Sequence, residues 1–102
     1  LSYGHQRLLE IAMGVAQNPR LLILDEPTQG LAESEIAGFK ELIGRLRAET
    51  TILLIEHNMD VVMSLADAIT VLETGRVLAS GTPEEVRADA RVQHAYLGTA
   101  PC

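Results

Sequence analysis

Cysteine, aromatic residues and lysine are all scarce in this sequence. Of its 102 residues, one is cysteine and three are aromatic. The single cysteine, Cys102, excludes a disulfide within the chain and favours a reducing compartment such as the cytoplasm. No apolar run approaches the roughly 20 residues that cross a bilayer, so we expect no membrane-spanning or targeting segment. A formal net charge of -6 argues against nucleic acid as a partner, because that binding needs a basic face.

Lysine occurs once, at Lys40, between Phe39 and Glu41. The Gly-x-x-x-x-Gly-Lys-Ser/Thr loop that cradles nucleotide phosphates is therefore not among these 102 residues. A hydrophobic content of 47% nevertheless indicates a folded aliphatic interior, and the length fits at most one domain.

Hydrophobic periodicity and capping residues predict helices that alternate with strands. We expect strands over 21–24 and 51–55, and a hairpin that pairs 69–73 with 77–80. The expected helices cover 2–17, 33–48 and 58–66, a short helix that begins at 82–85, and a final stretch through Val92 and Tyr96. Strands separated by such helices imply right-handed crossovers, hence an α/β fold with a mostly parallel sheet flanked by helices.

Helical spacing also predicts which residues form the core. The first helix should bury Leu8, Ile11, Ala12, Val15 and Ala16, and the second Ile36, Phe39, Ile43 and Leu46. The strand Leu21–Leu24 is wholly apolar, which is typical of a parallel strand covered on both faces.

Two adjacent carboxylates, Asp25 and Glu26, follow the first apolar strand. Such a run has the form of the Walker B segment of a P-loop NTPase: Leu21-Leu22-Ile23-Leu24-Asp25-Glu26-Pro27. Asp25 could hold Mg²⁺ through water, since this ion prefers hard oxygen ligands and keeps several waters. Glu26 could accept a proton from an attacking water. The structural alternative is an ordinary strand that ends in an acidic turn.

His57 follows the second strand. Because the carboxyl ends of parallel strands meet at one edge of a sheet, we expect His57 beside Asp25 and Glu26. An imidazole there could sense the terminal phosphate and orient the water. A solvated histidine at a strand end is the alternative, and Glu56 is expected to point elsewhere.

The start of the first helix is a candidate anion site. Ser2 and Gly4 would supply a hydroxyl and exposed backbone N–H groups at the positive end of the helix dipole. A plain N-cap is the simpler alternative. Arg7 is expected to be a solvated surface charge rather than a phosphate contact. His94 and Cys102 have no companion ligands for a metal site.

Three segments stand in the order found in an ATP-binding cassette: Leu1-Ser2-Tyr3-Gly4-His5, the Walker B run, and Ile55-Glu56-His57-Asn58. The chain resembles the C-terminal half of such an ATPase over essentially all of residues 1–102, with the Walker A loop and the Q-loop absent. The resemblance implies ATP and Mg²⁺ as cofactors. It further implies that Ser2, Gly4 and His5 bind nucleotide in trans, across a pair of cassettes. Asp25, Glu26 and His57 would act in cis.

Other features narrow the resemblance to branched-chain amino acid importers. These are Tyr3, the run 7–12, and a tail over 82–98 that ends in Ala95-Tyr96-Leu97-Gly98. Urea and amide importers share much of this pattern, and lipopolysaccharide-export cassettes have a similar ending. The resemblance implies a subunit on the inner face of the cell membrane whose ATP hydrolysis powers import. Its partners would be a second ATPase subunit, permease subunits and, indirectly, a solute-binding protein.

Two positions depart from the family pattern. His5 replaces the usual glutamine, and Ala32 stands where Asp or Asn ordinarily bridges the two cassettes and caps the next helix. A methyl group can do neither. Two other functions stay open, a cassette that acts on DNA and a non-catalytic dimerisation module; the acidic charge and the tail argue against the first. Without a phosphate loop, residues 1–102 by themselves are expected to be inactive.

Overall fold

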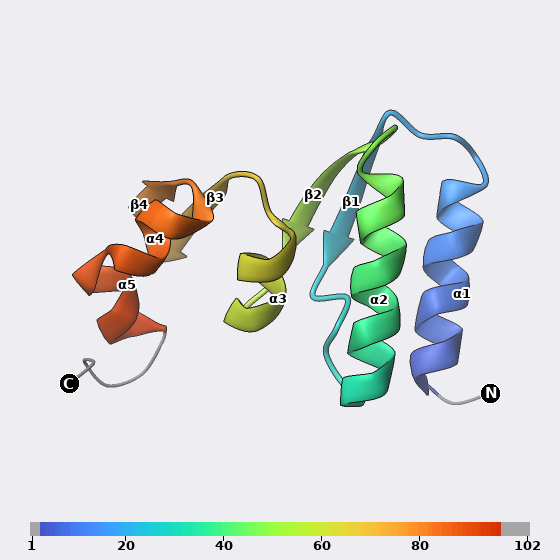
Figure 1. The fold of residues 1–102 in the computed structure, drawn as a ribbon, viewed down its shortest axis with the longest axis horizontal. Helices are drawn as coiled ribbons and strands as arrows, with labels where there is room; N and C mark the ends of the chain where they lie inside the picture. Colours follow the sequence, from blue (N-terminus) through green and yellow to red (C-terminus); the bar gives the residue numbers. More distant parts are fainter. Residues whose placement is uncertain (1–2, 97–102) are drawn as a thin grey trace.

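The computed structural model describes residues 3–96, so Ser2 and the tail beyond Tyr96 lie outside the described residues. This part of the chain contains five helices and four strands (Figure 1). In chain order they are α1 (Tyr3–Val15), β1 (Leu21–Asp25), α2 (Glu33–Leu46), β2 (Thr51–Ile55), α3 (Met59–Leu65), β3 (Ile69–Glu73), β4 (Arg76–Gly81), α4 (Pro83–Ala88) and α5 (Ala90–Ala95). The predicted alternation of helices and strands is confirmed.

The first half of the fold is a parallel pair of strands packed against helices. Strands β1 and β2 pair in a regular register from Leu21 opposite Thr51 to Asp25 opposite Ile55. Figure 1 shows α1 and α2 side by side next to this pair. Together with β1 and α3, the apolar faces of α1 and α2 form one core, whose buried members are Ile11, Leu24, Phe39, Ile43 and Val61. The predicted face of the second helix is confirmed.

The buried face of α1 is narrower than the sequence predicts. Leu8 and Val15 pack beside buried Ile11, whereas Ala12 and Ala16 are exposed. The helix also ends at Val15 rather than at residue 17. Asn18 adopts a left-handed φ of 53° before Pro19, which turns the chain toward β1.

Only one face of the β1–β2 pair is covered by the elements within residues 3–96. On the uncovered face, the side chains are 48–57% exposed: Leu21, Ile23, Leu53 and Ile55. The prediction that β1 is covered on both faces is therefore wrong for the described residues. The strand alternates, so every second side chain has no helix to pack against.

The second half of the fold is a hairpin covered by two short helices. Strands β3 and β4 are antiparallel, and both residues of their connection, Thr74 and Gly75, have positive φ, as in a type I′ turn. Thr82 caps α4 with a complete capping box, as predicted. A second core forms here from Ile69, Val71, Ala79, Val86 and Val92.

Helix α3 joins the two cores. Val61 is fully buried in the first, while Met59, Val62 and Met63 pack against the second. Asn58 caps this helix through the N–H of Val61 at 3.3 Å, as predicted. The result is an elongated body of 42 × 28 × 23 Å. No helix in the described part of the chain is long and apolar enough to span a membrane.

Candidate functional site

The carboxyl ends of β1 and β2 lie side by side. Beyond the last residue pair of the ladder, the N–H of Glu26 donates to the carbonyl oxygen of Ile55 at 2.7 Å. Glu26 then leaves the strand with a left-handed φ of 46°. A glutamate rarely adopts this conformation, so the surrounding contacts must hold it there.

The structure brings Glu26 and His57 together. Oε1 of Glu26 lies 2.5 Å from Nδ1 of His57, and the two side chains are 41% and 65% exposed. With Glu26 ionised, Nδ1 carries the proton and donates it to the carboxylate. The strand order predicts this proximity; the chemical role of the pair stays a prediction.

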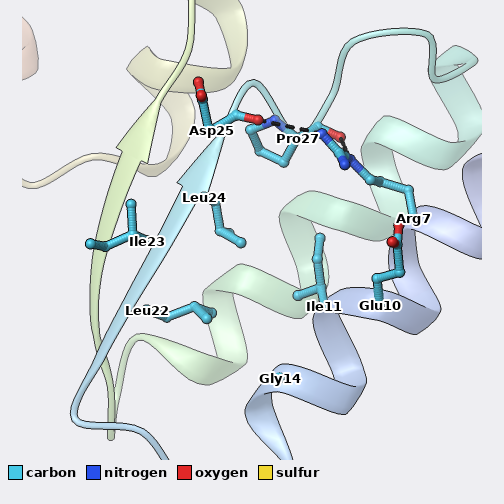
Figure 2. Close-up of a pocket in the computed structure, with 9 residues that line it drawn as sticks. All are labelled: Arg7, Glu10, Ile11, Gly14, Leu22, Ile23, Leu24, Asp25 and Pro27. Carbon is cyan, nitrogen blue, oxygen red and sulfur yellow. Dashed lines mark hydrogen bonds between the residues drawn. The ribbon is translucent and has the colours of Figure 1, made fainter.

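Asp25 lies at the same edge but outside this pair. Figure 2 shows its carboxylate pointing away from Arg7, on the other side of the backbone. No group of three histidine, cysteine, aspartate or glutamate side chains within residues 3–96 could hold a metal ion. Magnesium commonly needs only one or two protein carboxylates, because waters and substrate phosphates complete its shell. Asp25 fits such a water-mediated role.

Arg7 is not the solvated surface charge that the sequence predicts. From α1, its guanidinium donates to three successive carbonyl oxygens after β1: Asp25 at 3.4 Å, Glu26 at 3.2 Å and Pro27 at 3.3 Å (Figure 2). A planar fork of donors suits such a row of acceptors. Arg7 thus ties the first helix to the backbone that carries the two carboxylates.

A groove of about 300 Å³ runs between α1 and β1 below this arginine (Figure 2). Neither Glu26 nor His57 lines it, so it is not the place where the carboxylate and the imidazole meet. Its walls are mostly aliphatic, and its lining residues are Arg7, Glu10, Ile11, Gly14, Leu22, Ile23, Leu24, Asp25 and Pro27.

Glu56 has a partner that the sequence did not predict. Its carboxylate points to Thr28, whose N–H and hydroxyl donate to Oε2 at 3.2 Å and 2.6 Å. Thr28, which is buried, stands two residues after Glu26, and Glu56, which is half-buried, stands directly before His57. The sequence signal for this contact is a polar residue shortly after each of the strands β1 and β2. It predicts a hydrogen bond only once these two strands are known to be neighbours.

The start of α1 differs from the expected open anion site. Gly4 is buried, so its backbone is not exposed as predicted. The carboxylate of Glu35 covers it: a Cβ atom added to Gly4 would lie 2.0 Å from the carboxyl carbon. His5 is exposed in the first turn of α1, and Ser2 lies outside the described residues.

Ala32 is the N-cap of α2 and makes no side-chain cap, as predicted. The carboxylate of Glu35 instead accepts from the N–H of Ala32 at 2.9 Å. This is one half of a capping box, since a methyl group cannot accept the reciprocal hydrogen bond. Glu35 therefore lies between the N-terminal ends of α1 and α2.

Tyr3 packs against the loop that follows Thr28. A Cβ atom on Gly30 would lie 3.1 Å from the ring, and Gly30 has a φ of 84°. A side chain at position 30 would be both strained and crowded. The first residues of α1 therefore contact the segment after β1 at two places, through Arg7 at residues 25–27 and through the ring of Tyr3 at Gly30.

Comparisons with known proteins match both ends of the chain. Residues 1–29 match a family model described as "ABC transporter", and residues 76–101 match one described as "Branched-chain amino acid ATP-binding cassette transporter". The chain belongs to the ATP-binding cassette family. The α/β fold predicted from the sequence is confirmed by the order of helices and strands and by the similarity to a solved structure of an ATP-binding cassette described next.

Two curated relatives and one solved structure are similar along almost the whole chain. The branched-chain amino acid transport ATP-binding proteins BraF of Pseudomonas aeruginosa and LivG of Salmonella typhimurium are each 51% identical, over 98% of this chain and 40% of the relative. The crystal structure of MJ1267 in its ADP conformation, an ATP-binding cassette of an ABC transporter, has a TM-score of 0.83 at 31% identity, over 97% of this chain and 41% of that one. The chain thus spans about two fifths of the length of these relatives.

Proposed function

We propose that this chain is the C-terminal part of the ATP-binding subunit of an importer for branched-chain amino acids. The complete subunit would hydrolyse ATP on the inner face of the membrane to power transport. The observation that carries the ATPase assignment is the contact of Glu26 with His57 at the edge of the parallel strands. The match of residues 76–101 and the similarity to BraF support the choice of transported solute.

In this proposal Glu26 is the general base. It lies where the ligand crevice of a parallel sheet forms, and its carboxylate can accept a proton from water that attacks the terminal phosphate. Oε1 is engaged by His57, so the second carboxylate oxygen would accept the proton.

His57 would hold Glu26 and contact the terminal phosphate. With Nδ1 directed at Glu26, Nε2 is the remaining polar atom of the ring, and the side chain is 65% exposed. In the imidazolium form both nitrogens donate, so Nε2 could bind a phosphate oxygen while Nδ1 holds the carboxylate.

Asp25 would hold Mg²⁺ through water. The bound ion would supply positive charge to the phosphates as negative charge develops in phosphoryl transfer. The exposed position of Asp25 beside Glu26 supports this role.

A second cassette subunit would complete the ATP site. The closure of the two cassettes would be transmitted to the permease subunits. Ser2, Gly4 and His5 would contact the nucleotide of the partner in trans. The carboxylate of Glu35 lies against Gly4, where it would repel a phosphate. We therefore expect the Glu35 side chain to rotate away when the two cassettes close on ATP.

The substitution Glu26→Gln in the full-length subunit tests the ATPase assignment. It keeps the size of the side chain and removes its capacity to accept a proton. We expect steady-state phosphate release to fall about 10²- to 10⁴-fold, while ATP-bound dimers accumulate in gel filtration. Glu41→Gln is the matched control, because Glu41 forms an exposed pair with Arg45 on α2. Turnover of Glu26→Gln within about threefold of wild type would remove Glu26 from the catalytic role.

The transported solute is tested separately, by uptake of labelled leucine, isoleucine and valine into vesicles that contain the complete transporter. We expect ATP-dependent uptake of all three in wild type and none with Glu26→Gln. An ATPase that is active but transports none of them would leave the enzyme assignment intact and overturn the choice of solute.

A further inference from the structure

One carboxylate connects the two chain segments that carry Glu26 and His57. Oε2 of Glu56 accepts two hydrogen bonds from Thr28, from its hydroxyl at 2.6 Å and from its N–H at 3.2 Å. Oε1 accepts from the N–H of His57 at 3.2 Å. Thr28 is 4% exposed, so water cannot easily replace its bonds.

The hydrogen bonds between Thr28 and Glu56 lie where they can fix the distance between Glu26 and His57. Thr28 stands two residues after Glu26, and Glu56 stands directly before His57. The Glu56 carboxylate therefore joins the two segments within two residues of the point where Glu26 meets His57. The strained φ of Glu26 needs such external support, because an unsupported loop would relax to a common conformation.

We propose that Glu56 and Thr28 are positioning residues for ATP hydrolysis, which hold Glu26 at the distance and angle that proton transfer requires. This inference rests on the proposed function, in which Glu26 is the general base. Neither residue touches the reacting atoms. Each acts through the geometry of Glu26, and a displacement of about 1 Å at a reacting group can reduce a rate by about 10²-fold.

Conservative substitutions separate the hydrogen bonds from the packing. Thr28→Val keeps the shape of the buried side chain and removes the hydroxyl donor, whereas Thr28→Ser keeps that donor. Glu56→Gln presents one carbonyl oxygen and one NH₂ group, so it cannot accept from Thr28 and His57 at the same time.

The experiment measures kcat and KM for ATP with the full-length subunit. We expect Thr28→Val and Glu56→Gln to lower kcat about 10- to 100-fold while KM for ATP changes by less than about twofold. Thr28→Ser should recover kcat to within about threefold of wild type. Thr70→Val and Glu41→Gln are matched controls, since both side chains are exposed and pair away from the site.

A positioning role also predicts that the effects do not add. In the background of Glu26→Gln, Thr28→Val should cause no further loss of turnover, because there is no longer a base to misplace. A general weakening of the fold would slow both backgrounds equally and lower the melting temperature of both. Should Thr28→Val fail to fold, Glu56→Gln in the two backgrounds gives the same comparison.

The possible failures can be told apart. One outcome is that Glu26→Gln hydrolyses ATP slowly while Thr28→Val and Glu56→Gln keep the wild-type kcat. This outcome would overturn the positioning role and leave the proposed function intact. Normal turnover of Glu26→Gln would overturn the general base and the positioning role together. Equal losses in Thr28→Ser and Thr28→Val would also overturn the positioning role, because the hydroxyl bond would then not be the cause.

Discussion

The backbone N–H of Glu26 donates to the carbonyl oxygen of Ile55 at 2.7 Å, one residue beyond the end of β1. This hydrogen bond carries the parallel register past the strand and into the candidate site. As a consequence, Glu26 and His57 meet although 31 positions separate them in the chain. A slip of one residue between the strands would turn the side chains of one strand to the opposite face of the sheet and separate the pair.

Arg7 should contribute to turnover in the full-length subunit through backbone contacts alone. Arg7→Ala removes the donors to the carbonyl oxygens of Asp25, Glu26 and Pro27. We expect kcat to fall about 5- to 100-fold, since one to three lost hydrogen bonds of about 1 kcal/mol each are involved and about 1.4 kcal/mol corresponds to tenfold in rate. Arg45→Ala, which removes an exposed pair on α2, is the control for phosphate release. Equal rates for the two variants would contradict this role.

Residues 1–102 by themselves should neither bind ATP tightly nor hydrolyse it. The sequence contains no lysine-bearing loop to hold the β and γ phosphates, so Asp25, Glu26 and His57 have no bound phosphate to act on. Equilibrium binding of labelled ATP to the purified chain measures this. Micromolar affinity would mean that the nucleotide site lies elsewhere in these residues.

The uncovered face of the β1–β2 pair should make the isolated chain self-associate. Exposed aliphatic side chains on strands invite association, and Ile23 and Leu53 are 57% and 50% exposed. The double variant Ile23→Thr, Leu53→Thr should shift sedimentation toward monomer. The control Leu24→Ala changes the opposite, buried face and should cost about 2 to 5 kcal/mol of unfolding free energy. A monodisperse wild-type monomer that melts cooperatively above about 60 °C would contradict the expectation.

Asp89 should titrate at unusually low pH. Side-chain hydrogen bonds from Arg91, followed by the backbone N–H of Arg91, lower the pKa of Asp89 from its ordinary value of 3.8 to about 2. Because the folded pKa is depressed, the stabilisation is present above about pH 4 and is lost as the pH falls through about 2. A carboxyl NMR titration of the Ile23→Thr, Leu53→Thr variant, which we expect to be monomeric, measures the midpoint.

Asp89 is the N-cap of α5, where its carboxylate accepts from the N–H of Arg91. The substitution Asp89→Asn tests how the charge of this cap affects the helix. Asparagine can still cap the helix but carries no charge, so the acid-dependent loss of α5 helicity between about pH 4 and 2 should disappear. Asp60→Asn is a control, since that carboxylate pairs with Lys40 on a different helix. An Asp89 midpoint near 3.8 would show that the contact with Arg91 does not persist in solution.

Local patterns were sufficient to predict most of the elements. The spacing of Phe39 and Ile43 predicted the buried face of α2, and both are buried. Thr82 and Asn58 were expected to cap helices and do so. These features depend on residues within one or two turns of one another, so periodicity and capping chemistry are visible in the sequence.

Sequence patterns were enough to predict the alternation of helices and strands, the core-forming face of α2, and the placement of Asp25, Glu26 and His57 at strand ends that share one edge. Three contacts could not be predicted and depend on the folded arrangement: Arg7 binds three backbone carbonyls, Glu56 accepts from Thr28, and Glu35 covers Gly4. The difference lies in how far apart the contacting residues are along the chain. Helix periods and caps arise from neighbours along the chain, whereas these contacts join residues about 20 or more positions apart. Their partners are selected by how the helices pack on the strands, which no local pattern encodes.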